Sequence, residues 1–529
     1  MKILNDKEFA IIIHNTDEQA CLETINALQE IIVPENFEVD VIPVDGAEKY
    51  RAYNFAMTQT DAKYKIFLDV HISIRQKNIL AQILKIFQAD EKIGIIGTSG
   101  AVQLSTHGIC LNSKKRCGKI LSSARNVIDW GAAGENFCEV EAVDGFFIAT
   151  QYDLPWRQDI FADNYFGDAA QCLEFRRQGY KSVVANQKNP WLQNRWQDCP
   201  IDEKTQHIFL QEYSAEIFPL VSVIIPTADN PQHFREALES VLNQTYRHFE
   251  IIVSDRSSDD NTENLIQPYL EKFPCIKYFR HKNFGASENW NFARHYNNPA
   301  AEFVNFMIDE DLFYPRKLEV MVEIYRNNPK ISLVTSFRDT IDENGTLTGK
   351  LPILSELKSS SGKDFTISSA AAGKHLLNRG ENYIGELTTV LIRKKFLRDN
   401  DLCWTAEEPE FFPLIDVSTW CQLLTRGDLF FVAETLSAFR QNTEKNKQIS
   451  APVEIYWAKI FKIAWDKKIF LETEDEIRVR IIEWLFSACL RLKVSHAKKF
   501  TDKSITTLEK IMTAMTQALY NGYQINFFE

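Results

Sequence analysis

The sequence predicts an α/β protein: two similar Rossmann-like domains with mainly parallel sheets, followed by an α-helical region. Two segments that begin alike support this prediction, EFAIIIHN at 8–15 and LVSVIIPT at 220–227. Each is a short apolar strand, followed by an amphipathic helix and by a second strand that ends in an acidic residue, Asp45 or Asp255. Short buried-type strands that alternate with helices are typical of βαβ units and of parallel sheets.

A third strand in each segment extends the likeness. YKIFLDVH at 64–71 and EFVNFMIDED at 302–311 both run from apolar residues into acidic ones. We interpret the two segments as a diverged tandem duplication of one α/β domain. A chain of 529 residues is also too long for one ordinary core.

Patterning divides the chain into four regions, namely an α/β domain at 1–195, a linker at 196–218, an α/β domain at 219–450 and helices at 451–529. The linker is expected because its sequence is weakly periodic and contains Pro and Gln. The last region is expected to be helical because apolar residues recur there at steps of three and four.

One apolar face of the helical region is expected to pack on the preceding domain. It contains Ile482, Trp484, Leu485, Cys489 and Leu492. A homodimer contact through these helices and a membrane surface remain as alternatives.

Composition limits the partners and the compartment. A formal net charge of -12 argues against a nucleic-acid partner, because binders of a phosphate backbone carry concentrated basic surface. Ten Cys without CxxC pairs favour reduced thiols over a zinc site or a disulfide framework. The N-terminus is typical of a strand, and no apolar run approaches about eighteen residues. We expect a cytoplasmic protein, with any membrane contact peripheral at the inner face of the plasma membrane.

Polar residues at the strand ends of the central domain are the informative ones, because ligands of open α/β sheets bind there. Pro226 and Thr227 end the first strand, Asp255 ends the second, and Asp309 and Asp311 follow a later one. Two carboxylates one residue apart repel each other unless a cation lies with them. Oxygen ligands suit Mg²⁺ or Mn²⁺, which can bridge to substrate phosphates. The alternative is an acidic loop tip that caps the next helix.

The run VSVIIPTADNPQHFREALESVLNQTYRHFEIIVSDRSSDDNTENLI, followed by HKNFGASENWNFA and FVNFMIDEDLFYPRKLE, resembles the family 2 glycosyltransferases of the GT-A fold. The resemblance covers about residues 220–345. It implies a nucleotide-sugar donor, a divalent metal, and GT-A domains in tandem. The implied donor-binding residues are Pro226, Thr227, Asp255, Asn283, Gly285 and Asp309, and the implied metal ligands are Asp309 and Asp311. Glu288-Asn289 replaces the family's usual small-Arg-Asn step, which affects the expected donor sugar and diphosphate contacts.

Inverting members of that family use a carboxylate at the start of a later helix to deprotonate the acceptor. PLIDVSTWCQLL puts Asp416 there, with an ordinary helix N-cap as the alternative. The resemblance also implies that Arg440, in LSAFRQN, approaches the diphosphate. Trp290, Trp404 and Trp420 lie in segments that could stack on sugars, although burial is the commoner fate of Trp.

The N-terminal domain resembles glycosyltransferase-like relatives in the same superfamily over about residues 8–185. FLDVHISI and VDGFFIATQYDLPWRQDIFADNYFGDAAQCLEFRRQGYKSVVA carry this likeness. It implies metal binding by Asp69 and His71, a nucleotide contact at Asp45, and a catalytic base at Asp168. Imidazole is an acceptable ligand for Mn²⁺. An active second transferase and an inactive copy that shapes or binds the acceptor both remain open.

The predicted function is transfer of a sugar from a nucleotide-sugar, UDP-linked, to a hydroxyl with inversion. The acceptor would be a glycan, a lipid-linked sugar or a protein in bacterial surface glycan, glycolipid or glycoprotein synthesis. A two-site glycan polymerase is one alternative, and a noncatalytic carbohydrate- or nucleotide-binding assembly protein is another. A nucleotidyltransferase is disfavoured because the sequence lacks the glycine-rich, Arg/Lys-containing loop of those enzymes.

Overall fold

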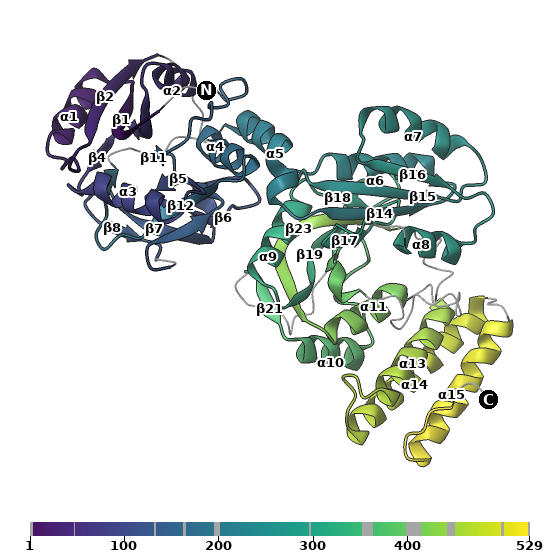
Figure 1. Cartoon of the computed structure of the whole chain (residues 1–529). Coiled ribbons are helices and arrows are strands. Elements are labelled where there is room, and N and C mark those ends of the chain that lie inside the picture. Colours follow the sequence, from purple (N-terminus) through teal and green to yellow (C-terminus); the bar gives the residue numbers. More distant parts are fainter. Residues whose placement is uncertain are drawn as a thin grey trace. The chain divides into compact units, whose positions relative to one another are not determined.

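The computed structural model describes residues 4–46, 48–131, 134–161, 166–194, 202–295, 298–351, 363–397, 414–441, 450–498 and 502–526. The chain forms two compact units, Met1–Phe218 and Pro219–Glu529. Each unit combines a sheet with flanking helices (Figure 1). Across these described residues, no helix has both the length and the apolar character needed to cross a bilayer.

The first unit contains, in chain order, β1 (Asn5–Asn15), α1 (Glu18–Leu28), β2 (Glu38–Asp45), α2 (Lys49–Thr58), β3 (Ala62–Asp69), β4 (Ile72–Ile74), α3 (Ile79–Ala89), β5 (Ile93–Gly97), β6 (Ser99–Gln103), the 3-10 turn η1 (Cys110–Asn112), β7 (Lys115–Leu121), β8 (Val127–Asp129), β9 (Phe137–Val140), β10 (Ala142–Val143), β11 (Phe147–Thr150), α4 (Phe166–Arg177), β12 (Lys181–Ala185), β13 (Leu192–Asn194) and α5 (Glu203–Ile217). Its main sheet has the order β2-β1-β3-β11-β5-β12-β9. β1 pairs in parallel with β2 and β3, whereas β11 is antiparallel to β3 and β5. The near-continuous apolar run of β1 follows from its central place, since both faces of a parallel sheet are covered.

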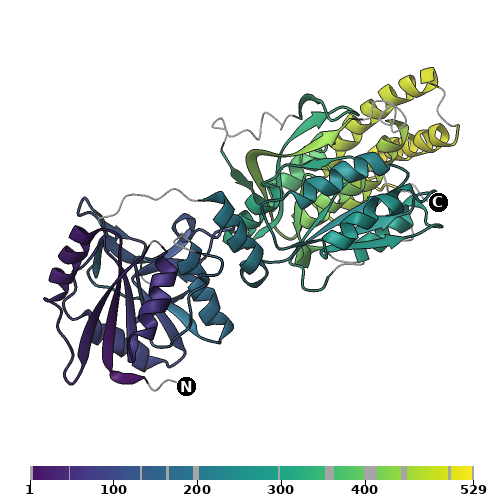
Figure 2. The same ribbon diagram turned by 90° about the horizontal axis from the view of Figure 1, so that it is seen from above.

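The second unit contains β14 (Val221–Thr227), α6 (Pro231–Leu242), β15 (Phe249–Asp255), α7 (Asn261–Lys272), β16 (Ile276–Arg280), α8 (Ala286–His295), β17 (Phe303–Phe306), β18 (Leu312–Phe313), α9 (Lys317–Asn327), β19 (Ile331–Ile341), β20 (Leu347–Leu351), β21 (Phe365–Ile367), α10 (Ser369–Arg379), β22 (Leu391–Arg393), the 3-10 turn η3 (Lys394–Phe396), α11 (Ile415–Leu424), β23 (Asp428–Arg440), α13 (Ser450–Asp466), α14 (Glu474–Lys498) and α15 (Asp502–Tyr520). Its sheet has the order β16-β15-β14-β17-β22-β19-β23-β18. Helices α6 and α7 lie on one side of the sheet and α8 on the other (Figures 1 and 2).

The main sheet of the first unit and the sheet of the second unit have the same strand order over six strands. In the second unit, β15-β14-β17-β22-β19-β23 repeats β2-β1-β3-β11-β5-β12 of the first, and both have an antiparallel strand at the same place. Parallel pairs flank that strand in both units. The predicted fold class, two tandem α/β domains with mainly parallel sheets and a helical C-terminal region, is therefore confirmed.

The segment 196–218, expected as a linker, contains helix α5. Phe209, Leu210, Tyr213 and Ile217 are buried at steps of one, three and four along it. Tyr213 donates its hydroxyl hydrogen to the Glu174 carboxylate on α4 at 2.7 Å. The amphipathic spacing of these apolar residues thus attaches helix α5 to the first unit.

The C-terminal helices share a hydrophobic core with the domain before them. Trp420 on α11, Phe461 on α13, Trp484 on α14 and Met515 on α15 belong to one cluster of buried residues. This confirms the expected packing on the preceding domain. The expected face was wrong in part, because Ile482 and Cys489 are exposed.

Candidate active site

The carboxyl ends of β14, β15 and β17 lie together at one edge of the second sheet. Thr227 lies opposite Asp255 in the parallel register, and Pro226 is buried within β14 one residue earlier. The Thr227 hydroxyl donates to Asp309 Oδ2 at 2.7 Å. Residues predicted separately from three strand ends are thus brought to one edge of the sheet.

Asp255 is fully buried and surrounded by donors. Its Oδ1 accepts from the backbone N–H and the hydroxyl of Ser257 at 2.7 and 2.5 Å. Its Oδ2 accepts from the Tyr278 hydroxyl at 2.7 Å and from Arg280 Nη1 at 3.0 Å. Since a carboxylate has about four acceptor positions, a contact with a nucleotide base would require Tyr278 or Arg280 to move.

Asp311 is a buried carboxyl in a group of acids. It accepts from the Thr388 hydroxyl at 2.6 Å and from the backbone N–H of Arg440 at 3.0 Å. Burial raises the pKa of Asp311 to about 8, and repulsion from Glu386 and Glu310 adds to the increase.

Asp416 lies in the first turn of α11, where Leu414, not Asp416, occupies the N-cap position. Its carboxylate accepts from Asn382 Nδ2 at 2.7 Å and from the backbone N–H of Val417 at 2.7 Å. Burial raises the pKa of Asp416 to about 7, and the negative charge of Glu386 raises it further. The alternative of a plain helix N-cap does not agree with this placement.

Glu386 is a site residue that the sequence did not reveal. Its negative charge adds to the rise in pKa that burial causes at both Asp311 and Asp416. Its own counter-ion is Arg338, whose Nε is 2.5 Å from Glu386 Oε2. The only available signal was an acidic residue shortly before β22, the antiparallel strand beside β17.

The donor set at this edge fits a hard divalent cation. The groups that lower the pKa of Asp311 are a hydroxyl and a backbone N–H, so a cation would relieve the repulsion among its acidic neighbours. Among the described residues, no three His, Cys, Asp or Glu side chains converge on one point. Mg²⁺ and Mn²⁺ sites that use one or two carboxylates, with substrate phosphates and water as the other ligands, agree with this arrangement.

Arg440 supports the turn that carries the two aspartates. Its Nε donates to the Glu310 backbone oxygen at 2.7 Å, and its Nη1 donates to the backbone oxygens of Asp342 and Glu343 at 2.9 Å each. Its Nη2 forms an ion pair with Glu236 at 2.6 Å. The expected approach to a diphosphate would require the guanidinium to leave these acceptors.

The loop between β16 and α8 carries Asn283 and Gly285, both exposed. The Gly285 N–H donates to Glu288 Oε2 at 2.7 Å, so the unusual acidic residue closes the first turn of α8. Asn289 exchanges hydrogen bonds with Ser254 at 2.7 and 2.8 Å, which ties α8 to the end of β15. The departure from the usual sequence step therefore has a local structural role.

The three tryptophans have different surroundings. Trp420 is fully buried and donates its indole N–H to the Gly385 backbone oxygen at 2.9 Å, so it belongs to the core. Trp290 is half-buried on α8, with its ring 6.3 Å from that of Phe306. Trp404 lies outside the described residues.

The first unit brings together a similar set of residues. Asp69 ends β3 and accepts from the His71 backbone N–H at 2.9 Å, and its charge raises the pKa of Asp168 in the first turn of α4. Asp45 is exposed at the end of β2. A Cβ atom at Gly145 would lie 1.7 Å from Asp168 Oδ2, so only glycine fits there. Asp69 and Asp168 thus interact electrostatically, and their role in a second site stays a prediction.

Lys49 distinguishes this set from the one in the second unit. Its Nζ lies 3.2 Å from both carboxylate oxygens of Asp168, and the two side chains are only 14% and 12% exposed. Burial raises the pKa of Asp168, and Lys49 opposes the shift. Asp416 instead has the neutral amide of Asn382 as its side-chain partner. In the first unit, the positive charge beside the Asp168 carboxylate is therefore the Lys49 ammonium group.

We expect Lys49→Met to lower the free energy of unfolding of the first unit by about 2–4 kcal/mol, because it leaves a buried carboxylate without its counter-ion. Scanning calorimetry of the full chain measures the change in the transition of that unit. Lys49→Arg keeps the charge and is expected to recover most of the loss. Equal stability of Lys49→Met and wild type would contradict the prediction.

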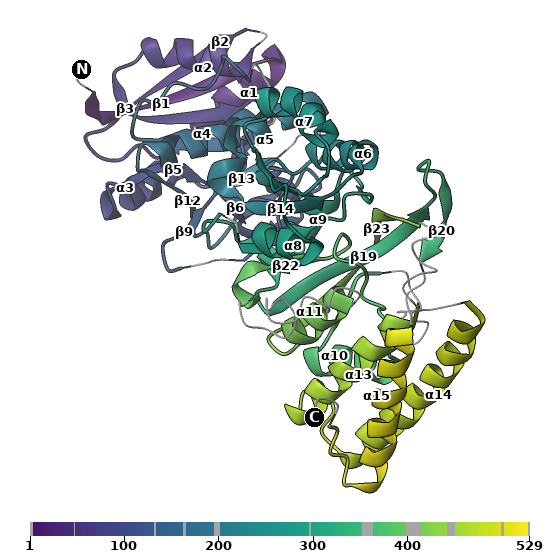
Figure 3. The ribbon, with the colours of Figure 1, turned by 90° about the vertical axis from the view of Figure 1, so that its right-hand side faces the viewer.

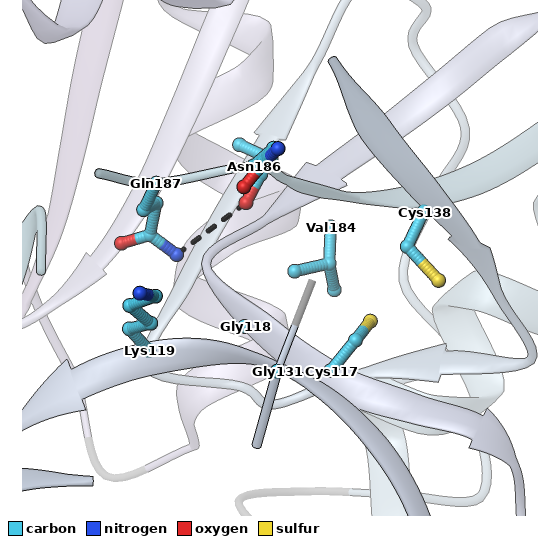
Figure 4. Close-up of a pocket in the computed structure, with 9 residues that line it drawn as sticks. Cys117, Gly118, Lys119, Gly131, Cys138, Val184, Asn186 and Gln187 are labelled. Carbon is cyan, nitrogen blue, oxygen red and sulfur yellow. Dashed lines mark hydrogen bonds between the residues drawn. The ribbon is translucent and has the colours of Figure 1, made fainter. Parts of the chain in front are cut away.

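A small pocket of the first unit lies apart from these carboxylates (Figure 4). Cys117 on β7 and Cys138 on β9 point their sulfur atoms toward each other in it, and none of the predicted site residues lines it. Burial raises the pKa of the Cys117 thiol, and the neighbouring Cys138 thiol raises it further. The described cysteines are free thiols, and Cys117 is held in its protonated form.

Comparisons with known proteins match each unit to a family model. Residues 10–213 match the model of a glycosyltransferase like family, and residues 222–380 match that of glycosyl transferase family 2. An uncharacterized glycosyltransferase of Rickettsia felis is 35% identical over 131 residues, which are 24% of this chain and 21% of that protein. The GalNAc(5)-diNAcBac-PP-undecaprenol beta-1,3-glucosyltransferase of Campylobacter jejuni is 32% identical over 105 residues, 20% of this chain and 34% of that protein. The matches thus span about a third or less of these relatives.

Two solved structures are also similar. TarS of S. aureus in complex with UDP-GlcNAc aligns with a TM-score of 0.33 and 15% identity, over 58% of this chain and 97% of that one. The mannosyltransferase of Pyrobaculum calidifontis in complex with GDP-Man and Mn²⁺ aligns with a TM-score of 0.37 and 15% identity, over 58% and 83%.

Proposed function

We propose that the chain is a tandem GT-A glycosyltransferase with a family 2 domain in its second unit, and that this unit transfers a sugar from a UDP-linked donor to a hydroxyl. Transfer proceeds with inversion at the anomeric carbon. The acceptor is a glycan, a lipid-linked sugar or a protein in bacterial surface glycan, glycolipid or glycoprotein synthesis. The reaction takes place in the cytoplasm or at the inner face of the plasma membrane.

The observation that carries this proposal is a pair of carboxyl groups, Asp311 and Asp416, that are both influenced by the charge of Glu386. Asp311 and Asp416 come from segments far apart in the chain, and the pKa of each is raised, to about 8 and about 7. A carboxyl with a pKa near neutrality is suited to accept a proton from an acceptor hydroxyl. Asn382 orients Asp416 by donating to Oδ2.

Asp309 and Asp311 are the residues that would hold Mn²⁺ or Mg²⁺. A divalent cation bound there would neutralise the charge that builds on the departing diphosphate. Thr227 fixes the Asp309 carboxylate, and Thr388 fixes that of Asp311. The chain would thus supply two carboxylate ligands, Asp309 and Asp311, beside the donor and one base, Asp416, beside the acceptor.

The test is a screen of nucleotide-sugars with the full chain, with and without Mn²⁺, for donor hydrolysis and transfer. We expect turnover of a UDP-sugar that requires the metal and is lost in Asp416→Asn. Glu271→Gln, an exposed carboxylate near the end of α7, is the control and is expected to keep full activity. Donor binding without turnover, unchanged by Asp416→Asn, would instead support a binding protein.

The pH profile tests the role of Glu386. Because its charge raises the pKa of Asp416, wild-type kcat/KM is expected to rise with pH up to about 7, where Asp416 loses its proton. Glu386→Gln removes that charge, so the acidic limb is expected to move to lower pH. An unmoved limb would show that Glu386 does not act on the base.

For the first unit, a role in shaping or binding the acceptor is favoured over a second transfer. Asp168, the counterpart of Asp416, forms an ion pair with Lys49 that Asp416 lacks, and this ion pair opposes the rise in pKa that burial causes. We expect Asp168→Asn to leave the kcat for transfer to a small acceptor within about twofold, whereas loss of a general base would cost about 10²-fold or more. Abolition of one of two distinct transfers by Asp168→Asn would support the two-site polymerase.

A further inference from the structure

Helix α14 carries apolar side chains on two opposite faces. Its inner face packs into the core of the second unit through Ile477, Ile481, Trp484 and Ala488, which are buried. The indole N–H of Trp484 donates to the Glu454 backbone oxygen on α13 at 2.9 Å. This inner face is sufficient to attach the helix to its own domain.

The outer face carries a second apolar stripe. Val479, Ile482, Phe486 and Leu490 follow one another at steps of three, four and four, so they lie along one side of the helix. Their side chains are 51%, 53%, 69% and 52% exposed. Helices α13, α14 and α15 lie together at the end of the unit (Figures 1 and 3). A continuous exposed apolar stripe of this kind marks an interaction surface.

The charges at the two ends of the stripe indicate the partner. Asp475 lies four residues before Val479, and Lys493 lies three residues after Leu490. Both are exposed. Asp475 forms an ion pair with Arg478 of the same helix at 2.6 Å, whereas Lys493 has no ion-pair partner among the residues that the structure describes. A second α14 that runs antiparallel, centred near residue 484, would place Asp475 beside the other copy's Lys493 and Ile482 against its Phe486. A parallel arrangement would place like charges together.

We propose that the outer stripe of α14 is the interface of a twofold homodimer in which two α14 helices pack antiparallel. Such an interface is self-complementary, as a twofold contact between identical chains requires. A membrane surface fits less well, because interfacial helices carry mainly Lys and Arg around the apolar face. Here the helix carries charges of both signs, with Glu474, Asp475 and Glu476 in its first turn and Arg491 and Lys493 toward its other end. The proposal does not depend on the transferase activity.

Sedimentation equilibrium of the full chain tests the proposal. Wild type is expected to associate to twice the mass of the chain, and Phe486→Glu is expected to raise the dissociation constant about tenfold or more. Because Phe486 is 69% exposed within the chain, the Phe486→Glu variant should keep the wild-type circular dichroism spectrum. A wild-type chain that stays monomeric at about 50 µM, far above the working range of a specific dimer, overturns the proposal.

Charge reversal makes the test specific to the antiparallel pairing. Asp475→Lys is expected to weaken the dimer by opposing the other copy's Lys493, and the double variant Asp475→Lys/Lys493→Asp is expected to restore it. Lys510→Asp, on the exposed side of α15, is the matched control and should change nothing. Failure of the double variant to recover overturns the pairing. Wild-type binding to phosphatidylglycerol vesicles that Phe486→Glu abolishes overturns it in favour of lipid.

Discussion

Asp416→Asn is expected to reduce kcat of the second unit by about 10²–10⁴-fold while leaving the apparent affinity for the nucleotide-sugar nearly unchanged. The side chain keeps its shape but loses the ability to accept a proton. Asn382 donates to one oxygen of this carboxylate and the Val417 N–H donates to the other. In Asp416→Asn, the single side-chain oxygen could therefore keep only one of these two hydrogen bonds in its present position. Steady-state kinetics with the donor and acceptor varied in turn measures the effect.

The pH profile separates a lost base from a distorted site. Since the pKa of Asp416 is raised to about 7, wild-type activity should fall as pH drops through that value. In Asp416→Asn the remaining activity should lack this limb. Asp364→Asn makes the same chemical change at an exposed carboxylate that accepts from the Ala433 N–H, and is expected to leave the profile intact. An Asp416→Asn enzyme with wild-type kcat would remove the proposed base.

The parts of the site that the sequence predicted are those that follow buried strands directly. Apolar runs fix β14 and β17 and, because parallel strands end at one edge, they also fix the neighbourhood of Thr227 and Asp309. Asp416 could be predicted because the family resemblance implies a carboxylate at the start of a helix that follows the metal motif at some distance in the sequence. These residues share one property, which is that short segments of sequence determine where their side chains lie.

The parts that could not be predicted depend on contacts between distant segments. Glu386 comes from a segment without regular patterning, and only the packing of β22 beside β17 brings its charge near Asp311. Lys49 begins α2, yet its partner Asp168 lies on α4. The resemblance pointed to Asp168, but no periodicity or motif in the sequence pairs it with Lys49.

The second face of α14 shows a limit of another kind. Periodicity indicates that apolar residues share a helix face, but it does not say which face is buried. Ile482 and Trp484 are two residues apart, so they lie on different sides of the helix, and only Trp484 meets the core. A helix that is apolar on two sides therefore needs the tertiary packing before its faces can be assigned.

Asp311→Asn is expected to lower kcat/KM by about 10²–10³-fold and to abolish the thermal stabilisation of the chain by Mn²⁺ and UDP together. An amide is a poor ligand for a divalent cation in place of a carboxylate, and the acidic neighbours alone lack the correct geometry. Differential scanning fluorimetry with and without Mn²⁺ measures the loss of binding separately from the loss of turnover.

The same variant should be at least as stable as wild type in EDTA. Burial raises the pKa of Asp311 to about 8, so the fold disfavours the ionised carboxylate, whereas a neutral amide carries no such penalty. The amide can also satisfy both neighbours, because its oxygen can accept from the Arg440 N–H and its NH₂ can donate to the Thr388 hydroxyl oxygen. Asp339→Asn, at a carboxylate that accepts from the Tyr314 hydroxyl outside the site, is the matched control with full metal-dependent activity expected. Mn²⁺-dependent transfer by Asp311→Asn within about threefold of wild type would mean that the cation is held elsewhere, because loss of a carboxylate ligand costs more than that.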